Sequence, residues 1–318
     1  MTCWVGDLCH LTTTLGGVTG DAWWWACDAG SPSAQQRMDM VQIFLCDGLV
    51  IRDLTLRGSP VWTLHPTLCN DVVVDAMVIE SGQFDDVPEY SGHNVDGCDP
   101  DSCTNVVISN SFVKAGDDCV AIYSIHGPTR NVTVRNLTCH TPLSITHGFG
   151  GTSDVTFDNC TVNGGWGSGS PLYRPRWWHT AIRIKTDRKT NGTVERVHYK
   201  DIIANDVDLV FDIQSWYPCQ NQSGMENYMD CRSFFSPIAG VRPHVLNITF
   251  ENIQADTAWR SVWANCLPES PCFGVDLSGI DVGAGTLPGI CENVDGLGSD
   301  CRPVEPGRNR PGFPKKAD

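Results

Sequence analysis

The sequence of 318 residues lacks an excess of positive charge: 22 lysines and arginines stand against 37 aspartates and glutamates, for a formal net charge of −15. Nucleic-acid binding depends on basic patches, so this balance argues against a nucleic-acid partner. An acidic polymer stays open as a partner, because a local basic spot can lie in an acidic protein. The chain also lacks a run of 18 apolar residues, which argues against a membrane span and a membrane partner.

The sixteen cysteines lack the C-x₂-C spacing that is typical of a zinc site. Disulfides in an oxidising compartment are therefore the better interpretation, and we expect neither a metal nor a cofactor. The spacing leaves the connectivity open. Five short-range pairs occur: Cys98 and Cys103, Cys119 and Cys139, Cys219 and Cys231, Cys266 and Cys272, and Cys291 and Cys301.

Six N-x-S/T sequons fit a glycoprotein that a eukaryote secretes. They lie at Asn131, Asn136, Asn159, Asn191, Asn221 and Asn247. The alternative is that Asn and Thr recur there as part of a structural repeat. Residues 1–4 (MTCW) do not open a signal peptide, so we interpret the chain as lacking its true N-terminal segment and expect an extracellular protein.

A short strand pattern recurs along the chain, with no convincing amphipathic helix between its copies. Each copy alternates its faces, is rich in β-branched residues, and is closed or followed by Asn or Asp. The copies are residues 49–54, 72–77, 106–110, 132–136, 155–159, 197–201 and 248–252. Successive starts among the first five, from Val50 to Val155, are 22 to 34 residues apart. Repeats of this size, made of strand and turn, indicate a solenoid.

We predict an all-β fold, a right-handed parallel β-helix, over residues 1–302, followed by a disordered tail over 303–318. A β-sandwich or a propeller is the alternative architecture, but the regular turn signals of the one and the blade signature of the other are not apparent. Aliphatic stacks would fill the interior, and Asn side chains would turn the corners.

The long intervals 155–197 and 197–248 predict protruding loops. Several aromatic residues fall in or near them, where they could stack on sugar rings: Trp166, Trp177, Trp178, Trp216 and Tyr217.

Two acidic clusters, at Asp96 and at Asp117–Asp118, lie 21 residues apart. That spacing is about one coil, and neighbouring coils of a β-helix lie roughly 4.8 Å apart. Three carboxyl groups would therefore meet on one face, where like charges resist joint ionisation. Such a group can perform acid/base cleavage of a glycosidic bond. Taken singly, an Asp-Gly pair is usually a turn, and an Asp-Asp pair is usually solvated or binds calcium.

Arg183 and Lys185 share one face of a predicted strand, with Ile184 turned inward. Two cations on one wall could hold a substrate carboxylate, although an Arg-x-Lys pair alone is usually a solvated strand face. We predict that strand 120–122 stacks beside strand 143–145. Adjacent aspartates point to opposite faces of an ideal strand, so a local bend or bulge must re-aim one member of Asp117–Asp118.

These motifs resemble glycoside hydrolase family 28, the polygalacturonases and related pectinases. The family pattern runs Asn-Thr-Asp, Asp-Asp, Gly-His-Gly and Arg-Ile-Lys. Residues 94–96 (NVD) match the first motif with Val for Thr, Asp117–Asp118 match the second, and residues 183–185 (RIK) match the last. Residues 59–66 and 97–103 resemble the exo-acting and plant-like branch. Residues 20–25 resemble the family's early coil, and residues 291–294 with Cys301 resemble its closing coil. The resemblance covers most of residues 15–302.

The third motif departs from the family pattern. The family histidine lies directly before a Leu-Ser-Ile strand, but here residues 140–142 (HTP) precede Leu143 and place Thr141 over Asp118. Three alternatives follow: His140 swings into the site, His147 substitutes from the far end of the strand, or the site has no histidine and its activity or specificity is altered.

The resemblance implies hydrolysis of α-1,4-linked galacturonan with inversion, by a monomer that acts on an acidic polysaccharide. Asp117 would be the general acid, while Asp96 and Asp118 would hold and deprotonate the attacking water. Arg183 and Lys185 would hold the galacturonate carboxylate. Asn94 would orient Asp96 or the sugar, and the remaining implied substrate contacts are Gln214, Tyr217, His140 and His147.

Two other hypotheses stay open from the sequence. A calcium-dependent pectate lyase would use acidic side chains and an arginine base, and a secreted β-helix could bind acidic glycan without cutting it. The exo-like motifs favour trimming from chain ends, and the exact polymer (homogalacturonan, xylogalacturonan or rhamnogalacturonan) is not determined.

Overall fold

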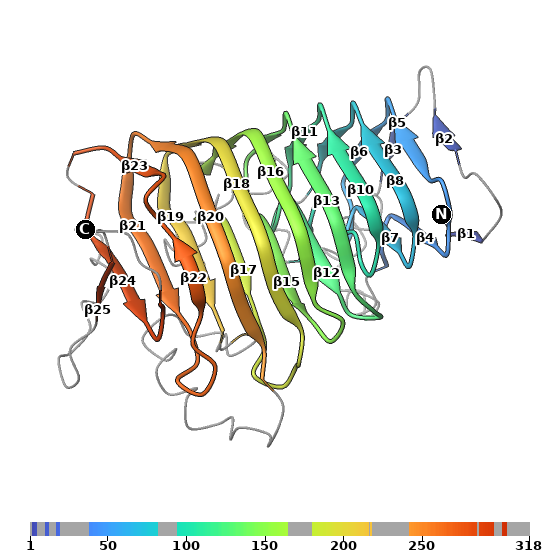
Figure 1. Ribbon diagram of the computed structural model, residues 1–318. Helices are drawn as coiled ribbons and strands as arrows, with labels where there is room; N and C mark the ends of the chain where they lie inside the picture. Colours follow the sequence, from blue (N-terminus) through green and yellow to red (C-terminus); the bar gives the residue numbers. More distant parts are fainter. Residues whose placement is uncertain are drawn as a thin grey trace, which may run out of the picture.

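The structure, a computed structural model, consists of parallel strands wound into successive coils along one axis (Figure 1). It describes residues 2–4, 10–12, 17–19, 38–81, 94–164, 180–215, 217, 242–284, 286–295 and 301–303. Several predictions fall outside these residues: the tail after residue 303, the first-coil resemblance at 20–25, the four loop tryptophans, the sequon at Asn221 and the Cys219–Cys231 pair. The described part contains no helix that is long and apolar enough to cross a membrane.

Sheet A runs along one side of the coils as two groups of parallel strands. The first group is β1 (Thr2–Trp4), β4 (Val41–Phe44) and β7 (Leu64–Thr67). The second is β12 (Val120–Ser124), β15 (Leu143–Gly148), β17 (Thr180–Lys185), β19 (Val207–Gln214), β21 (Ala258–Asn265), β24 (Gly289–Glu292) and β25 (Cys301–Pro303). Residues 98–101 join the two groups, because Cys98 pairs with both Leu64 and Val120.

Sheet B has 15 strands and covers the remaining sides of each coil. In the early coils a bend separates two short strands: β2 (His10–Thr12), β5 (Val50–Arg52), β8 (Asn70–Asp75), β10 (Thr104–Ser109) and β13 (Thr129–Arg135) lie before it, and β3 (Gly17–Thr19), β6 (Thr55–Arg57), β9 (Val78–Glu80), β11 (Phe112–Lys114) and β14 (Thr138–Cys139) lie after it. In the later coils one long strand spans both positions, in β16 (Thr152–Asn163), β18 (Thr193–Asn205) and β20 (His244–Ala255). The last members are β22 (Phe273–Asp276) and β23 (Ile280–Val282).

The bend in sheet B recurs at the same position on the described coils between residues 50 and 255, and it is occupied mainly by Asn and Asp. Asn110, Asn136 and Asn159 are stacked there with φ of 50° to 56°. Asn and Asp tolerate this left-handed conformation better than other non-glycine residues. Each side-chain amide also donates a hydrogen bond to the preceding coil, as Asn136 Nδ2 does to Asn110 Oδ1 at 3.0 Å. The predicted corner role of Asn is confirmed, and the same role explains the Asn of two sequons.

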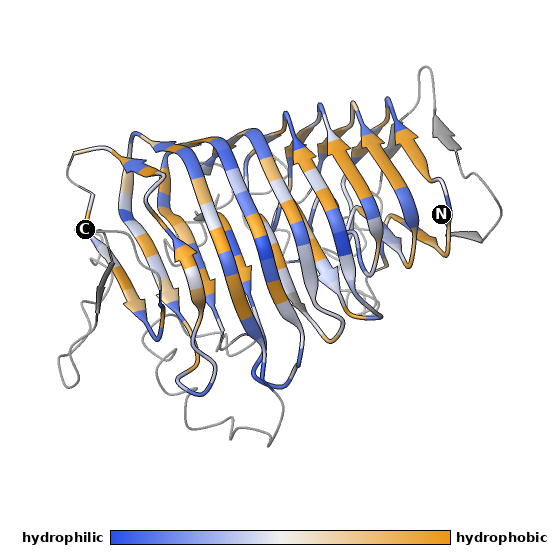
Figure 2. Cartoon of the chain, in the orientation of Figure 1, coloured by the Kyte–Doolittle hydropathy of each residue, from blue (hydrophilic) through white to orange (hydrophobic). Residues whose placement is uncertain are grey.

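The core lies inside the coils and is built from columns of stacked apolar residues. One column is Val72, Val106, Val132, Val155, Val197, Ile248 and Val275, all buried and in register. Burial of each such side chain contributes about 1.5–3 kcal/mol before conformational entropy is counted. Inside the later coils Tyr199 stacks between Phe157 and Phe250, at centroid distances of 4.8 Å and 5.2 Å. A core inside the coils requires apolar and polar residues to alternate along each strand, and this alternation is visible in Figure 2.

Two of the predicted cysteine pairs are disulfides, Cys119–Cys139 and Cys266–Cys272. Cys291 is also disulfide-bonded. The short-range pair Cys98 and Cys103 is not a disulfide, because both are free, buried thiols. Residues 98–101 run extended between β7 and β12, so the chain carries the two sulfur atoms apart despite their closeness in sequence.

Candidate active site

Asp96 and Asp118 lie level with each other on neighbouring coils. Gly97 N donates to the backbone oxygen of Asp118 at 2.9 Å. Glycine is required for this approach, since a Cβ at Gly97 would lie 2.4 Å from the carbonyl oxygen of Cys119. The near one-coil spacing therefore does bring the two acidic clusters together.

The Asp117–Asp118 pair lies in an unusually long turn. Seven residues lead from Val113 to Val120, whereas four lead from Cys139 to Leu143, and the two segments start and end level with each other. The additional residues leave regular strand geometry, so the two side chains are not forced onto opposite faces. The expected local bend is present in the form of this turn.

Asp117 is anchored to the coil of Asp96. Its backbone N–H donates to Val95 O at 3.0 Å, and its carboxylate Oδ2 accepts from Asn94 N at 3.1 Å. Asn94 thus positions Asp117 through its backbone. Asp117 is 8% exposed, against 2% for Asp96 and 0% for Asp118, so it is the most accessible of the three carboxyl groups.

A fourth carboxyl group, Asp99, lies beside the other three and is fully buried. Burial raises the pKa of Asp96 well above its usual value, and the charges of Asp117 and Asp118 raise it further. Burial also raises the pKa of Asp99, and the charge of Asp96 raises it further. Burial and neighbouring charge therefore favour the protonated forms of both Asp96 and Asp99.

Two buried cations face the carboxylates from β17. Lys185 Nζ donates to Asp118 Oδ2 at 2.6 Å, and Arg183 Nη1 lies 3.7 Å from Asp118 Oδ1. Ile184 between them belongs to the core, as the strand alternation predicts. Burial is the largest single effect and lowers the pKa of Lys185, but the neighbouring groups, Asp118 first among them, together outweigh it and raise the pKa of Lys185. The small side chain of Ser144 on the intervening strand β15, level with Arg183, leaves room for these contacts.

Three further residues extend the site past the cations. Asp212 lies level with Arg183, and its Oδ2 is 3.9 Å from Arg183 Nε. Gln214 Nε2 donates to the same oxygen. Burial raises the pKa of Asp212 to about 7 even though Arg183 lowers it. The ring of Tyr217 lies 5.3 Å from Lys185 Nζ, so both predicted residues of this later strand, Gln214 and Tyr217, join the cation group.

The histidine position is occupied by threonine. Val120 pairs with Leu143, which places Thr141 level with Asp118, and Thr141 Oγ1 has no hydrogen-bond partner in the described part of the chain. His140 packs its ring against Phe112 at 5.4 Å. The backbone of His147 lies in β15, and its side chain is outside the described atoms.

Sequence reasoning missed Asp99 and Asp212 as members of the site. The signal for Asp212 was present, because strand alternation puts it on the same face as Gln214. Asp99 belongs to the first acidic cluster of the sequence, but its place beside Asp96 depends on how residues 98–101 bridge β7 and β12.

Comparisons with known proteins agree on one family. A family model described as "Glycosyl hydrolases family 28" matches residues 12–301. The chain is 24% identical to a probable polygalacturonase of Vitis vinifera, covering 88% of this chain and 54% of that protein. It is 23% identical to an exopolygalacturonase of Oenothera organensis, with 84% and 68% covered. The chain therefore spans about half to two thirds of the length of these relatives.

The solved structure of a polygalacturonase from Erwinia carotovora ssp. carotovora superposes with a TM-score of 0.65 at 20% identity, covering 87% of this chain and 64% of that one. This likeness and the parallel strand pairing confirm the predicted right-handed parallel β-helix. Because the family model spans the coils that carry both acidic clusters and the cation strand, the chain belongs to glycosyl hydrolase family 28.

Proposed function

We propose that this protein hydrolyses α-1,4-galacturonosyl linkages of pectin by an inverting mechanism, outside the cell. The single observation that carries the proposal is the contact of Lys185 and Arg183 with Asp118, beside Asp96 and Asp117. It joins acid/base groups to two cations on one face of sheet A. Hydrolysis of an acidic polysaccharide needs both kinds of group, because the glycosidic oxygen must be protonated and the substrate carboxylate must be held.

Asp118 and Asp96 hold the attacking water in this proposal. Oxygen Oδ1 of each accepts no hydrogen bond within the described residues, so both can accept one from a water molecule. Lys185 Nζ donates to the other oxygen, Oδ2, which leaves Oδ1 of Asp118 to take the proton of that water.

Asp117 is the general acid that protonates the leaving oxygen. It is the most exposed of the three carboxyl groups, and Asn94 N contacts only its Oδ2, which leaves Oδ1 for the substrate. The raised pKa of Asp96 means that the crowded group retains a proton.

Arg183 is the cation that turns most readily to the substrate. Its contacts of 3.7 Å and 3.9 Å are divided between Asp118 and Asp212, whereas Lys185 is held on Asp118 at 2.6 Å. A galacturonate carboxylate would form an ion pair with the guanidinium of Arg183, which would give up these two long contacts.

The disulfides Cys119–Cys139 and Cys266–Cys272 support an extracellular location, since such bonds persist in oxidising compartments. The sequence motifs similar to the exo-acting branch support trimming from chain ends. Release of monomer alone from polygalacturonic acid would show exo action, and mixed oligomers would show endo action.

The test is an assay on polygalacturonic acid with and without a chelator. We expect new reducing ends that are independent of calcium, with no product that absorbs in the ultraviolet, and a large loss of activity in Asp117→Asn. Activity that a chelator abolishes, with an unsaturated product, would establish a pectate lyase instead. Undiminished hydrolysis by Asp117→Asn would overturn the acid assignment.

A further inference from the structure

Many buried polar atoms on the outward face of sheet A have no hydrogen-bond partner in the described part of the chain. They include atoms of the proposed catalytic groups, such as Asp96 Oδ1 and Asp118 Oδ1, and Gln214 Oε1 further along the same face. A buried polar group without a partner destabilises a fold, so proteins retain such groups mainly where a ligand or water completes them.

Asn265 continues this set beyond the residues already described. Its side chain is 1% exposed, and both of its amide atoms lack a partner within the described residues. It lies at the end of β21, in register with Gln214 of β19, which is in turn in register with Lys185 of β17. Val262 and Ala264 of β21 belong to the core, so strand alternation places Asn265 on the outward face with Lys185.

Asn265 is as deeply buried as the residues of the proposed site. Asp118 is 0% exposed, Arg183 2% and Lys185 4%, so the whole row is covered to the same degree. Trp263, two residues earlier on the same strand face, lies level with Asp212 and outside the apolar core cluster. An aromatic ring beside a buried amide is the combination that suits a sugar, which offers an apolar ring face and hydroxyl groups.

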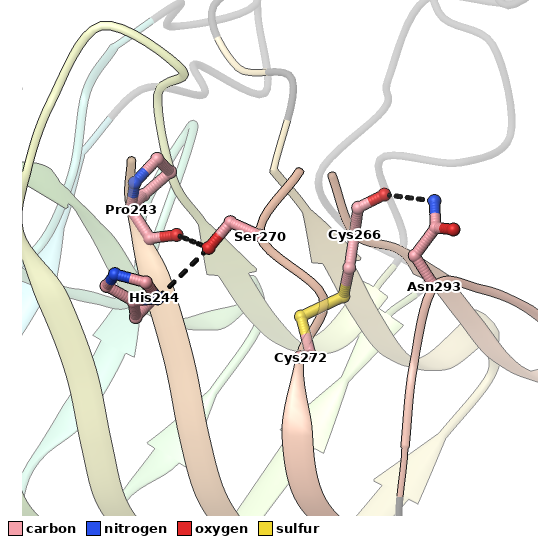
Figure 3. The surroundings of a disulfide bond; sticks show 6 residues. All are labelled: Pro243, His244, Cys266, Ser270, Cys272 and Asn293. Carbon is pink, nitrogen blue, oxygen red and sulfur yellow. Dashed lines mark hydrogen bonds between the residues drawn. A yellow bond between two sulfur atoms is a disulfide. The ribbon is translucent and has the colours of Figure 1, made fainter. Parts of the chain in front are cut away.

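The backbone around Asn265 is held rigidly although its amide is unpaired. Cys266 forms the disulfide with Cys272, and Cys266 O accepts from Asn293 Nδ2 at 3.0 Å (Figure 3). Cys266 N donates to Glu292 O, also at 3.0 Å. A binding group on a fixed strand end loses little freedom when it takes a ligand, which favours a binding role.

We propose that Asn265, with Trp263 beside it and Gln214 on the neighbouring coil, forms a further sugar subsite past the cation pair. The inference rests on the proposed function, because it gives the same polymer one more contact. Gln214 Nε2 is engaged with Asp212, so Gln214 offers its Oε1 as an acceptor, while Asn265 offers a donor and an acceptor. A hydroxyl group, which both donates and accepts, matches this arrangement.

The subsite favours hydroxyl groups over a second carboxylate. An amide carries no charge, and the next residue in the row after Asn265 is the acidic Glu292. A carboxylate bound there would face that acidic residue, whereas the Arg183 and Lys185 contacts already accommodate one carboxylate on the neighbouring sugar.

The test compares wild type with Asn265→Leu on galacturonide oligomers of increasing length. We expect kcat/KM to rise with length in wild type and to rise less in the variant, with a loss of about threefold to tenfold on long oligomers, as for one neutral hydrogen bond. The unfolding midpoint of the variant should be unchanged or higher, because an unpartnered buried amide has been removed. Thr152→Val is the control: it removes a different buried polar group without a described partner, a hydroxyl in sheet B, and should leave the length dependence unchanged.

A second measurement separates this inference from the proposed function. Binding of polygalacturonate is measured in the Asp117→Asn background, where no cleavage is needed, and Asn265→Leu should weaken it by the same factor. If wild type cleaves nothing but this binding difference holds, the hydrolase proposal fails and the subsite stands. An unchanged length dependence together with unchanged binding would overturn the subsite.

Discussion

Lys185 Nζ lies 2.6 Å from Asp118 Oδ2, although the strand β15 separates their coils. Both groups are buried, at 4% and 0% exposure, and Arg183 adds a second positive charge at 3.7 Å from Asp118. The pair links a proposed catalytic carboxylate to a cation proposed to hold the substrate, so one contact serves both parts of the proposed site.

Lys185→Met should therefore impair both stability and activity. The change leaves Asp118 buried with only the longer Arg183 contact, and breaking one partner of a buried pair costs about 3–5 kcal/mol. We expect a loss near the lower end of that range, since Arg183 remains, together with a large fall in kcat/KM. Chemical denaturation and steady-state kinetics would measure the two effects.

The double variant Lys185→Met with Asp118→Asn is the control for that prediction. It removes both charges of the pair, so stability should recover by most of the loss while activity stays absent. Equal instability of the single and double variants would show that the lysine stem, and not the charge pair, stabilises this region.

Asp99→Asn tests the fourth carboxyl group. Asp99 is fully buried, its pKa is raised by burial and by the charge of Asp96, and an asparagine amide matches the neutral carboxyl group in shape and in having a donor. We expect kcat in mildly acidic buffer to stay within about threefold of wild type, whereas Asp99→Leu, which cannot donate, should lower kcat by about tenfold or more with little change in KM. Similar losses in both variants would show that Asp99 acts as a charge.

Asp212→Asn should flatten the dependence of stability on pH. Burial raises the pKa of Asp212 from 3.8 to about 7, so the folded state binds this proton more tightly than the unfolded state. The stabilisation is fully present below pH 3.8 and is lost as pH rises through about 7. Urea midpoints measured across this window should fall less in the variant than in wild type.

Asp276→Asn provides the comparison for Asp212. A hydrogen bond from Ser278 lowers the pKa of Asp276, so its contribution has the opposite sign and is lost only as pH falls below the usual carboxyl range. The two variants should therefore change the pH profile at different ends. A wild-type slope retained in Asp212→Asn would contradict the prediction.

Gly97→Ala should separate the two acidic clusters. The added Cβ would lie 2.4 Å from Cys119 O and 2.4 Å from Val113 Cγ1, and the backbone contact cannot be relieved by a side-chain rotation. We expect destabilisation of about 1–3 kcal/mol from overpacking and a clear loss of kcat, because the coil that carries Asp96 must move.

Gly127→Ala is the matched control for Gly97. The nearest atom to its added Cβ, Ser102 Cβ, is at 3.8 Å, an ordinary contact. Stability and kcat should therefore remain close to wild type. Full activity in Gly97→Ala would show that the close approach of the two coils is not needed.

Much of the fold could be predicted because its physical signals are local. Alternation in residues 106–110 and 132–136 identifies strands with one buried face, and the Asn that follows each strand identifies the bend. The pairing of Cys98 with Cys103 could not be judged in this way, since a short separation in sequence does not show that the intervening chain is extended.

The sequence by itself determined the repeat, the corner residues, the approximate one-coil spacing of Asp96 from Asp117–Asp118, and the shared face of Arg183 and Lys185. These features follow from the two-residue period of a strand and from the length of one coil, and both can be recognised along the chain without knowing its fold. Only the tertiary structure decided that Asp118 is the carboxylate held by Lys185, that Asp99 is buried beside Asp96, and that Cys98 and Cys103 are free thiols. Such contacts depend on turn lengths and on the register between coils, because an offset of a few residues in one turn determines which side chains meet across the next.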